Sequence, residues 1–308
     1  MNKIHDSQKN QGMTLISVRF LTDLRRILLS RTNAHPIKRI LIFSLVFIFF
    51  FTSPTLAKRR KSRGSGPIGC RSVIFSDSTK LKRLYGKGVH TRVQPASTTK
   101  VMTALLVLER LSLNKYVTVG RNATYVQPSK INVIPGEKYK VSELLYAILL
   151  SSANDASIVL AEAVAGSEQN FVHLMNQRAK QLGARQTRFV NSNGLPSRRS
   201  QYTTAYDMYL IFRQALRHGF FRKAIALQYN TIESRGGRKI ALKSHNKILF
   251  GDWKRKIYGK TGYTRAAQAC FVGAMKKEES TLIIAVFGCS KRWETIKHVV
   301  SRYGGVAL

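Results

Sequence analysis

Two groups of strand-like segments enclose a run of apolar helical segments in this chain of 308 residues. Residues 68–76 and 83–85 have the pattern of two paired strands, with a turn at 77–80 between them. Residues 269–275 and 281–288 flank a polar turn at 276–280, which is typical of a β-hairpin. This order predicts an α+β architecture in which an all-helical subdomain is inserted between strand regions.

The middle of the chain contains four predicted helices in succession. Residues 101–111 are apolar on nearly every side, so we expect this helix to be buried on most of its faces. The next two helices are predicted at 141–150 and 155–165, and Gly166 ends the second of them. Ser167 is a suitable N-cap for a fourth helix that ends at Gly183. Further helices are predicted at 205–216 and at 292–303.

The first 57 residues have the features of an export signal. Lys38 and Arg39 precede an apolar run at 40–51, and small residues follow it up to Ala57. A run of about a dozen apolar residues suits a secretory signal and is short for a membrane span, which needs about 20. We expect export with cleavage after Ala57, to the periplasm or the outer face of the cytoplasmic membrane. A later start at Met13 and an uncleaved segment that acts as a tether are the alternatives.

The chain is strongly basic, with a formal net charge of +37. Residues 1–57, a signal peptide with an extended basic N-region, hold eight Lys/Arg and two Asp/Glu, so residues 58–308 retain a charge of +31. Residues 58–67 are predicted to be a basic linker before a folded domain at 68–308. Anionic envelope polymers or a membrane surface are the candidate partners of such a charge. A lysine-rich surface without a dedicated partner explains it equally well.

No nucleic-acid partner is expected, because aromatic residues do not interleave with the basic ones in a recognisable binding pattern. The three cysteines, Cys70, Cys270 and Cys289, allow at most one disulfide within the chain. Their spacing fits no metal site, and by default we interpret them as small apolar core residues in strands. We therefore expect neither a metal nor another cofactor.

Three short motifs occur in a fixed order: Ser97-Thr-Thr-Lys100, then Ser152-Ala-Asn154, then Lys260-Thr-Gly262. Each has an ordinary explanation when taken alone: an N-cap serine with a solvated lysine, two polar residues at helix ends, and a turn that enters a strand. Ser-x-x-Lys also recurs at 112–115 and 244–247 of this lysine-rich chain. The ordered set of three is far less expected by chance.

Together the motifs supply the groups of a serine acyl-transferase that works without histidine. Ser97 and Lys100 are one helical turn apart, so their side chains lie on the same face. A serine hydroxyl becomes nucleophilic when a base takes its proton, and a lysine can do so once burial lowers its pKa. Ser152 is suited to relay a proton, and Asn154 to orient the backbone of a substrate. A lysine and a threonine in the third motif form a carboxylate site.

The motifs and their neighbours resemble those of the low-molecular-mass penicillin-binding proteins, the serine D-alanyl-D-alanine carboxypeptidases. The resemblance extends from residue 68 to the C-terminus, so that 68–308 is expected to be the catalytic domain. The segments that carry it are 95–105, 152–156, 193–196, 203–208 and 259–264.

The resemblance implies a fold, an activity and a set of site residues. The fold is a five-stranded antiparallel sheet flanked by helices, beside a helical subdomain, with the active site between them. The substrates are peptidoglycan stem peptides, and β-lactam antibiotics are covalent inhibitors. The implied site comprises Ser97 as nucleophile, Lys100 as its base, Ser152 and Asn154 on the helical side, Lys260 and Thr261 for the terminal carboxylate, and the backbone N–H groups of Ser97 and Tyr263 as the oxyanion hole.

Two departures from the family pattern bear on this interpretation. Many members continue into a C-terminal β-rich domain and an anchoring helix, whereas this chain ends at Leu308, so anchoring by the C-terminus is not expected. Members also vary in an extra basic residue near the carboxylate site. His245 lies in about that region of the sequence, and we assign it no role.

Three other functions remain as alternatives. A β-lactamase would use the same site but needs a glutamate with an asparagine four residues later, and neither Glu162 nor Glu168 has one. We therefore expect the acyl-enzyme formed with penicillin to deacylate slowly, so that penicillin inhibits the enzyme. A DD-endopeptidase would use the same machinery as the carboxypeptidase. A non-catalytic cationic protein that binds the cell envelope is supported by the net charge alone.

Overall fold

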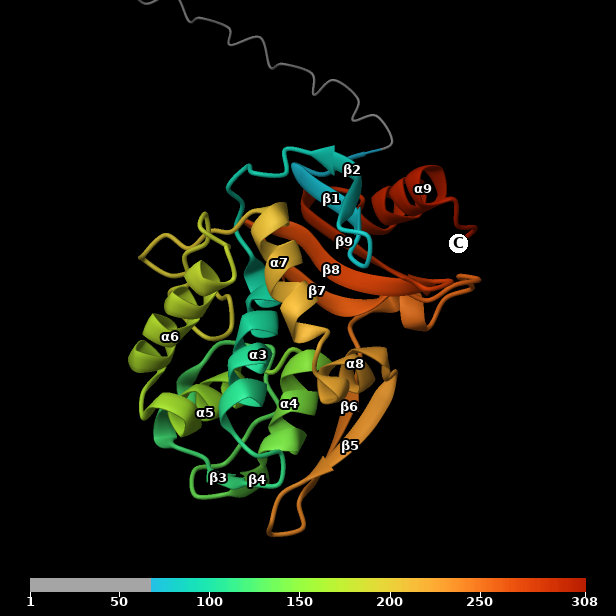
Figure 1. The fold of residues 1–308 in the computed structure, drawn as a ribbon. Coiled ribbons are helices and arrows are strands. Elements are labelled where there is room, and N and C mark those ends of the chain that lie inside the picture. Colours follow the sequence, from blue (N-terminus) through green and yellow to red (C-terminus); the bar gives the residue numbers. More distant parts are fainter. Residues whose placement is uncertain (1–67) are drawn as a thin grey trace, which may run out of the picture. The chain divides into compact units, whose positions relative to one another are not determined.

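A computed structural model describes residues 68–308 of the chain (Figure 1). The predicted signal peptide at 1–57 and the predicted linker at 58–67 lie outside the described residues. Within 68–308, none of the helices has the length and apolar character that crossing a membrane requires.

One antiparallel sheet organises the described chain. Its strand order is β2-β1-β9-β8-β7, so the two N-terminal strands pair with the C-terminal hairpin, and β2 and β7 are the two edges. This arrangement confirms the predicted α+β fold with an antiparallel sheet. The strands are β1 (Ser72–Asp77), β2 (Lys82–Lys87), β7 (Tyr258–Thr264), β8 (Gln268–Lys277) and β9 (Ser280–Cys289).

Helices cover both faces of this sheet (Figure 1). The alternation of side chains along β1 divides them between two cores: Val73 and Phe75 pack with α9 (Arg292–Gly304), whereas Ile74 belongs to the core of the helical side. α7 (Ala205–Ala215) covers that second face and contacts β1, β8 and β9. The sheet is therefore the middle layer between α9 and the larger helical region.

The helical region lies between β2 and β7 in sequence, as predicted. Every residue of its central helix from Lys100 to Val107 is buried, which confirms the expectation from its all-round apolar pattern. Ser167 caps a helix by accepting from Asn170 N, and Gly166 ends the preceding helix with φ +75°. The helices are α3 (Lys100–Arg110), α4 (Val141–Leu149), α5 (Asn154–Ala165), α6 (Glu168–Gln181) and α8 (Gly219–Ala226), and a 3₁₀ helix, η1 (Ala96–Thr99), precedes α3.

Two small ladders accompany the helices and were not predicted. β3 (Tyr116–Thr118) pairs with β4 (Lys138–Lys140), and β5 (Tyr229–Glu233) pairs with β6 (Lys239–Lys243). Each of these strands is three or five residues long and buries a single residue, which leaves little apolar pattern from which to predict a strand. The inserted subdomain is thus helical except for these short hairpins. Two further 3₁₀ helices, η2 (Arg121–Tyr125) and η3 (Lys247–Leu249), lie in its connections.

The cysteines differ from the default interpretation. Cys70 and Cys289 form a disulfide that joins the segment before β1 to the end of β9, across a sequence separation of 219 residues. Only Cys270, in β8, is a buried free thiol. Cys70 and Cys289 are buried in the core on the α9 side of the sheet, which agrees with the interpretation as core residues, but that interpretation missed their disulfide. Pairing of β1 with β9 places both at the same end of the sheet.

The disulfide generates a prediction about stability. Replacing both Cys70 and Cys289 by Ala should lower the free energy of unfolding by about 2–4 kcal/mol, because the cross-link restricts the unfolded chain over a long loop. Urea unfolding followed by circular dichroism measures the change. Cys270→Ala is the control for loss of a sulfur without loss of a cross-link. Equal unfolding midpoints for the double variant and the oxidised wild type would contradict the prediction.

Candidate active site

The three predicted motifs meet in one cleft of about 290 Å³. Ser97 comes from η1, Ser152 from the junction of α4 and α5, and Thr261 from the edge strand β7. Three parts of the chain that are separated by 55 and 109 residues thus share one site. The cleft is lined by Ser97, Ser129, Ser152, His245, Thr261, Gly262, Tyr263 and Arg292.

Ser97 and Lys100 are in direct contact. The Lys100 Nζ lies 3.1 Å from Ser97 Oγ, because η1 leads straight into the first turn of α3. Lys100 is fully buried, although a lysine is almost never fully buried unless it has partners. It has two further ones: Asn154 Oδ1 at 2.6 Å and the carbonyl oxygen of Asn193 at 2.8 Å.

The surroundings of Lys100 favour its neutral form. Burial, assisted by the positive charge of Lys260, holds the pKa of Lys100 well below its usual value, and Asp155 acts in the opposite direction. A neutral amine has two N–H donors and one lone pair. If its hydrogens point to Asn154 and Asn193, the lone pair is left for the hydroxyl proton of Ser97. Lys100 Nζ can therefore accept the hydroxyl proton of Ser97.

The turn at Asn193 is a part of the site that the motif analysis left without a role. Gly194 has φ +85°, and a side chain there would overlap the carbonyl group of Ala96, next to the nucleophile. The glycine thus lets the backbone of this turn approach η1 closely, which brings the Asn193 carbonyl to Lys100. Only the family resemblance of residues 193–196 indicated that this turn could belong to the site, because a backbone carbonyl that acts as an acceptor has no sequence signature of its own.

Ser152 and Asn154 begin the second wall of the cleft. Ser152 adopts φ +60°, a left-handed conformation that is unusual for serine, and its side chain accepts from Lys260 Nζ at 3.1 Å. Asn154 connects two elements, since its Nδ2 also donates to the carbonyl of Gln127 at 2.9 Å. Its backbone N–H donates to the Ser129 carbonyl, which fixes the loop that carries Ser129 against the cleft.

β7 provides the opposite wall. Lys260 is buried, and its Nζ donates to Ser152 Oγ and to the Thr261 carbonyl at 3.0 Å. Burial, followed by the charge of Arg292, lowers the pKa of Lys260 to about 7. Gly262 packs against η1 so closely that an added methyl group would lie 3.1 Å from the backbone nitrogen of Ser97. Tyr263 is 70% exposed at the mouth of the cleft.

Arg292 is a cleft residue that sequence reasoning missed. It is the first residue of α9, and its Nη1 donates to the carbonyls of Gly262 at 3.1 Å and Cys270 at 2.7 Å. Its Nε is buried without a hydrogen-bond partner in the described structure. The pKa of Arg292 is lowered, chiefly by burial, to about 10, so the group is charged at neutral pH. No local motif marks this arginine among the many of the chain.

His245, which received no role from the sequence, also lines the cleft. Burial and the charges of Lys260 and Lys100 lower its pKa to about 4, so the imidazole is neutral at physiological pH. It therefore does not supply the extra positive charge that some family members have in this region. Arg292 supplies a positive charge from a different element.

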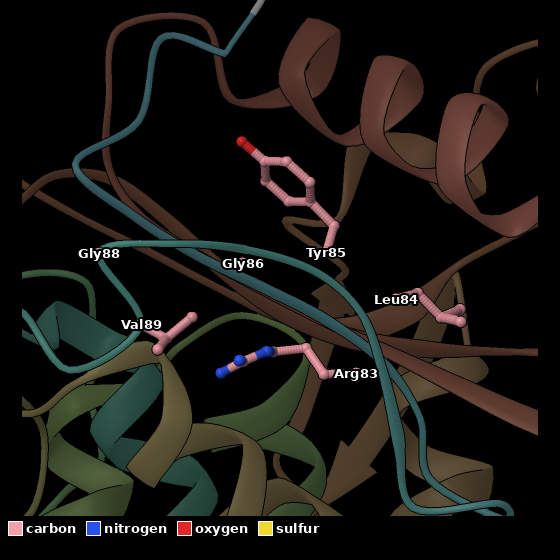
Figure 2. A pocket seen from close by; sticks show the side chains of 6 residues that line it. All are labelled: Arg83, Leu84, Tyr85, Gly86, Gly88 and Val89. Carbon is pink, nitrogen blue, oxygen red and sulfur yellow. The ribbon is translucent and has the colours of Figure 1, made fainter.

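The residues that line the cleft include no acidic side chain. Glu162 accepts from Asn122, and Glu168 from Ser192, and neither lines the cleft. Among residues 68–308 no three His, Cys, Asp or Glu side chains gather as a metal site would need. A second cavity of about 390 Å³ lies beside the edge strand β2 and contains none of the predicted site residues (Figure 2).

The lowered pKa of Lys260 predicts how stability depends on pH. Between pH 7 and 10.5 the unfolded chain binds a proton at Lys260 that the folded chain lacks, so the free energy of unfolding rises with pH in this window. One such group contributes at most about 1.4 kcal/mol per pH unit. Lys260→Met should remove this part of the slope in urea titrations at several pH values. Parallel pH profiles for variant and wild type would contradict the assignment.

Comparisons with known proteins agree with this geometry. Residues 59–291 match the family D-alanyl-D-alanine carboxypeptidase (Peptidase_S11). The D-alanyl-D-alanine carboxypeptidase DacF of Bacillus subtilis is 32% identical over 266 residues, which are 82% of this chain and 67% of that protein. DacB2 of Mycobacterium tuberculosis is 34% identical over 227 residues, 72% of this chain and 77% of that protein.

Solved structures give the same result. A D-alanyl-D-alanine carboxypeptidase from Mycobacterium tuberculosis superposes with a TM-score of 0.72 at 31% identity, covering 79% of this chain and 94% of that one. A mutant of the DD-transpeptidase of Streptomyces K15 superposes with a TM-score of 0.72 at 26% identity, covering 78% and 99%. By fold, motifs and similarity, this chain belongs to the D-alanyl-D-alanine carboxypeptidase family of serine peptidases.

Proposed function

We propose that this enzyme removes the terminal D-alanine from peptidoglycan pentapeptide stems through an ester intermediate on Ser97. The observation that carries the proposal is the contact of Ser97 Oγ with the Nζ of a buried lysine whose two other neighbours are hydrogen-bond acceptors. That set of contacts gives the serine a base that is uncharged before the reaction begins.

In the first step Ser97 Oγ attacks the carbonyl carbon of the penultimate D-alanine, and its proton passes to Lys100. The peptide bond then breaks, and the nitrogen of the departing D-alanine takes a proton by way of the Ser152 hydroxyl. Ser152 is suited to this relay because it contacts Lys260 on one side and borders the same cleft as Ser97. In the second step water hydrolyses the ester and restores Ser97 with the shortened stem.

The terminal carboxylate of the substrate would bind at the β7 wall, to Lys260, Thr261 and Arg292. The unsatisfied Nε of Arg292 and the charge of this side chain at neutral pH support this assignment, since a guanidinium is well suited to a carboxylate. Asn154 would hold the backbone of the acyl part. The N–H groups of Ser97 and Tyr263 would form the oxyanion hole, and the close packing of Gly262 on η1 supports this because it brings β7 to the nucleophile.

Export is part of the proposal, because peptidoglycan lies outside the cytoplasmic membrane. The signal-like pattern at 1–57 supports it, with residues 58–67 as linker and 68–308 as catalytic domain, and so does the disulfide, which persists in oxidising compartments. The enzyme would act in the periplasm or at the outer face of the membrane. The charge of residues 58–308 supports an association with anionic envelope polymers or with the membrane surface.

β-Lactams would acylate Ser97, and the resulting ester would hydrolyse slowly. The absence of an acidic side chain from the lining of the cleft supports this, since no carboxylate is in place to activate water against the ester. Penicillin would thus act as an inhibitor of this enzyme and not as its substrate. An endopeptidase activity on cross-bridges would use the same residues.

Ser97→Ala should abolish covalent labelling and lower D-alanine release by about 10³-fold or more, because it removes the hydroxyl that contacts buried Lys100 and forms the ester. Mass spectrometry of the wild type treated with benzylpenicillin should find the adduct on Ser97, persisting for minutes. Ser112→Ala, in the second Ser-x-x-Lys sequence, is the matched control and should behave as wild type. An adduct on another residue, or a fully active Ser97→Ala enzyme, would refute the proposal.

Arg292→Gln should lower kcat/KM for a peptide with a free C-terminal carboxylate by about tenfold or more, the usual effect of losing a charge-assisted hydrogen bond. The same peptide with an amidated C-terminus should be affected much less, which separates carboxylate binding from damage to the fold. Lys297→Gln, an exposed position of the same helix, is the control. An equal loss with both peptides would argue against a carboxylate role.

A further inference from the structure

Asp155 is a buried carboxylate that lies beside the site and outside the lining of the cleft. It is the second residue of α5 and directly follows Asn154, whose Oδ1 accepts from Lys100 Nζ at 2.6 Å. It takes part in none of the ion pairs found among residues 68–308. Because an acidic side chain is almost never fully buried without a partner, its contacts need an explanation.

The hydrogen bonds that the Asp155 carboxylate accepts in the described structure come from backbone N–H groups. Its Oδ2 accepts from Ile131 at 3.0 Å and from Val133 at 3.2 Å, and its Oδ1 accepts from Ala156 at 2.8 Å within α5. These donors are neutral, and the N-terminus of α5 adds a favourable dipole. They hold the carboxylate in place without cancelling its charge.

The same region of α5 fixes the loop that carries Ser129, which lines the cleft. The Asn154 side chain and backbone donate to the carbonyls of Gln127 and Ser129. Asp155 accepts from the N–H groups of residues 131 and 133 of the same loop. The first two residues of α5 thus secure the loop at residues 127, 129, 131 and 133, so a change at Asp155 has a structural effect as well as an electrostatic one.

The charge of Asp155 acts on Lys100. It raises the pKa of that lysine, whereas burial and the charge of Lys260, from β7, lower it. The pKa of His245, about 4, is set by burial, Lys260 and Lys100, and that of Lys260 by burial and Arg292, from α9. Asp155 is the acid among these interacting groups of the described chain, and it acts on Lys100 and not on the other two.

This opposing effect becomes favourable once the reaction begins. In acylation Lys100 takes the proton of Ser97 and becomes an ammonium group in a buried site, where a charge is costly without a counter-charge. The Asp155 carboxylate provides that counter-charge. An interaction that is stronger in the transition state than before it accelerates the step.

We propose that Asp155 is a positioning residue of the acylation step: its carboxylate stabilises the ammonium that forms on Lys100 and holds Asn154 and the Ser129 loop against that amine. The proposal rests on the proposed function, which assigns Ser97 and Lys100 their roles. The O–H bond of Ser97 breaks, its proton moves to Lys100 Nζ, and Oγ bonds to the carbonyl carbon. Asp155 itself exchanges no proton.

The test is the pH profile of acylation by benzylpenicillin, measured as a second-order rate constant for wild type and for Asp155→Asn. Asparagine has nearly the same shape and keeps an oxygen for the loop, but has no charge. The acid limb reports protonation of Lys100 and should move to lower pH in the variant, because Lys100 then holds its proton less well. On the plateau the rate constant should fall by about tenfold, since a weaker base without a counter-charge takes the proton less readily.

Asp207→Asn is the matched control. Asp207 is also a buried carboxylate in the first turn of a helix, α7, and it also holds a neighbouring segment, by accepting from Gln186 N at 2.7 Å and Thr187 Oγ1 at 2.8 Å. It is not among the charges that act on Lys100, so this variant should lose thermal stability and keep the wild-type acid limb. The alkaline limb, which reports the charge of Lys260, should stay in place in both variants.

Coinciding acid limbs for Asp155→Asn and wild type would overturn the role of Asp155 and leave the proposed function intact. A shift of the same size in Asp207→Asn would also overturn it, since loosening of the fold would then be the cause. Asp155→Ser removes the same charge if the asparagine variant does not fold, and failure of both to fold would mean a structural role and count against the proposal. A wild type that is not acylated at any pH would instead contradict the proposed function.

Discussion

The burial of Lys100 is the constraint on which the rest of the site depends. An ammonium group away from water is costly unless it is paired, and none of its three contacts is with a carboxylate. The partners are a serine hydroxyl, an amide oxygen and a backbone carbonyl, which serve a neutral amine well. The fold thereby lowers the pKa of a lysine next to a serine and so favours its uncharged form, and a serine peptidase with such a base needs no histidine.

Holding that lysine requires three parts of the chain to approach closely, and two glycines make the approach feasible. Gly194 brings the Asn193 carbonyl to Lys100, and Gly262 brings the edge strand β7 to the backbone of Ser97. The large apolar core shared by the helices and one face of the sheet fixes these parts relative to one another. The polar site is therefore positioned mainly by apolar packing around it, with the Asn154 side chain as a direct link to the neighbouring loop.

The same arrangement places several positive charges near one another. Lys260 lowers the pKa of Lys100, and Arg292 contributes to the lowering of that of Lys260. Each cation thus makes it easier for the next lysine to lose its proton, while the arginine keeps its own charge. A field of this sign attracts anions, which agrees with a substrate that ends in a carboxylate and with the wider excess of Lys and Arg on this chain.

The sequence alone determined the fold class, most helices and the three motifs, because these features depend on residues that are close together along the chain. Examples are the all-round apolar residues of α3, the cap at Ser167, and short motifs with fixed spacing. Tertiary structure alone decided which distant groups meet. It paired Cys70 with Cys289 across the sheet and brought Arg292, from the last helix, into the cleft. It also gave Lys100 the Asn193 carbonyl as a partner. Backbone acceptors and long-range pairs leave no trace in local composition, since they arise only when the chain has packed.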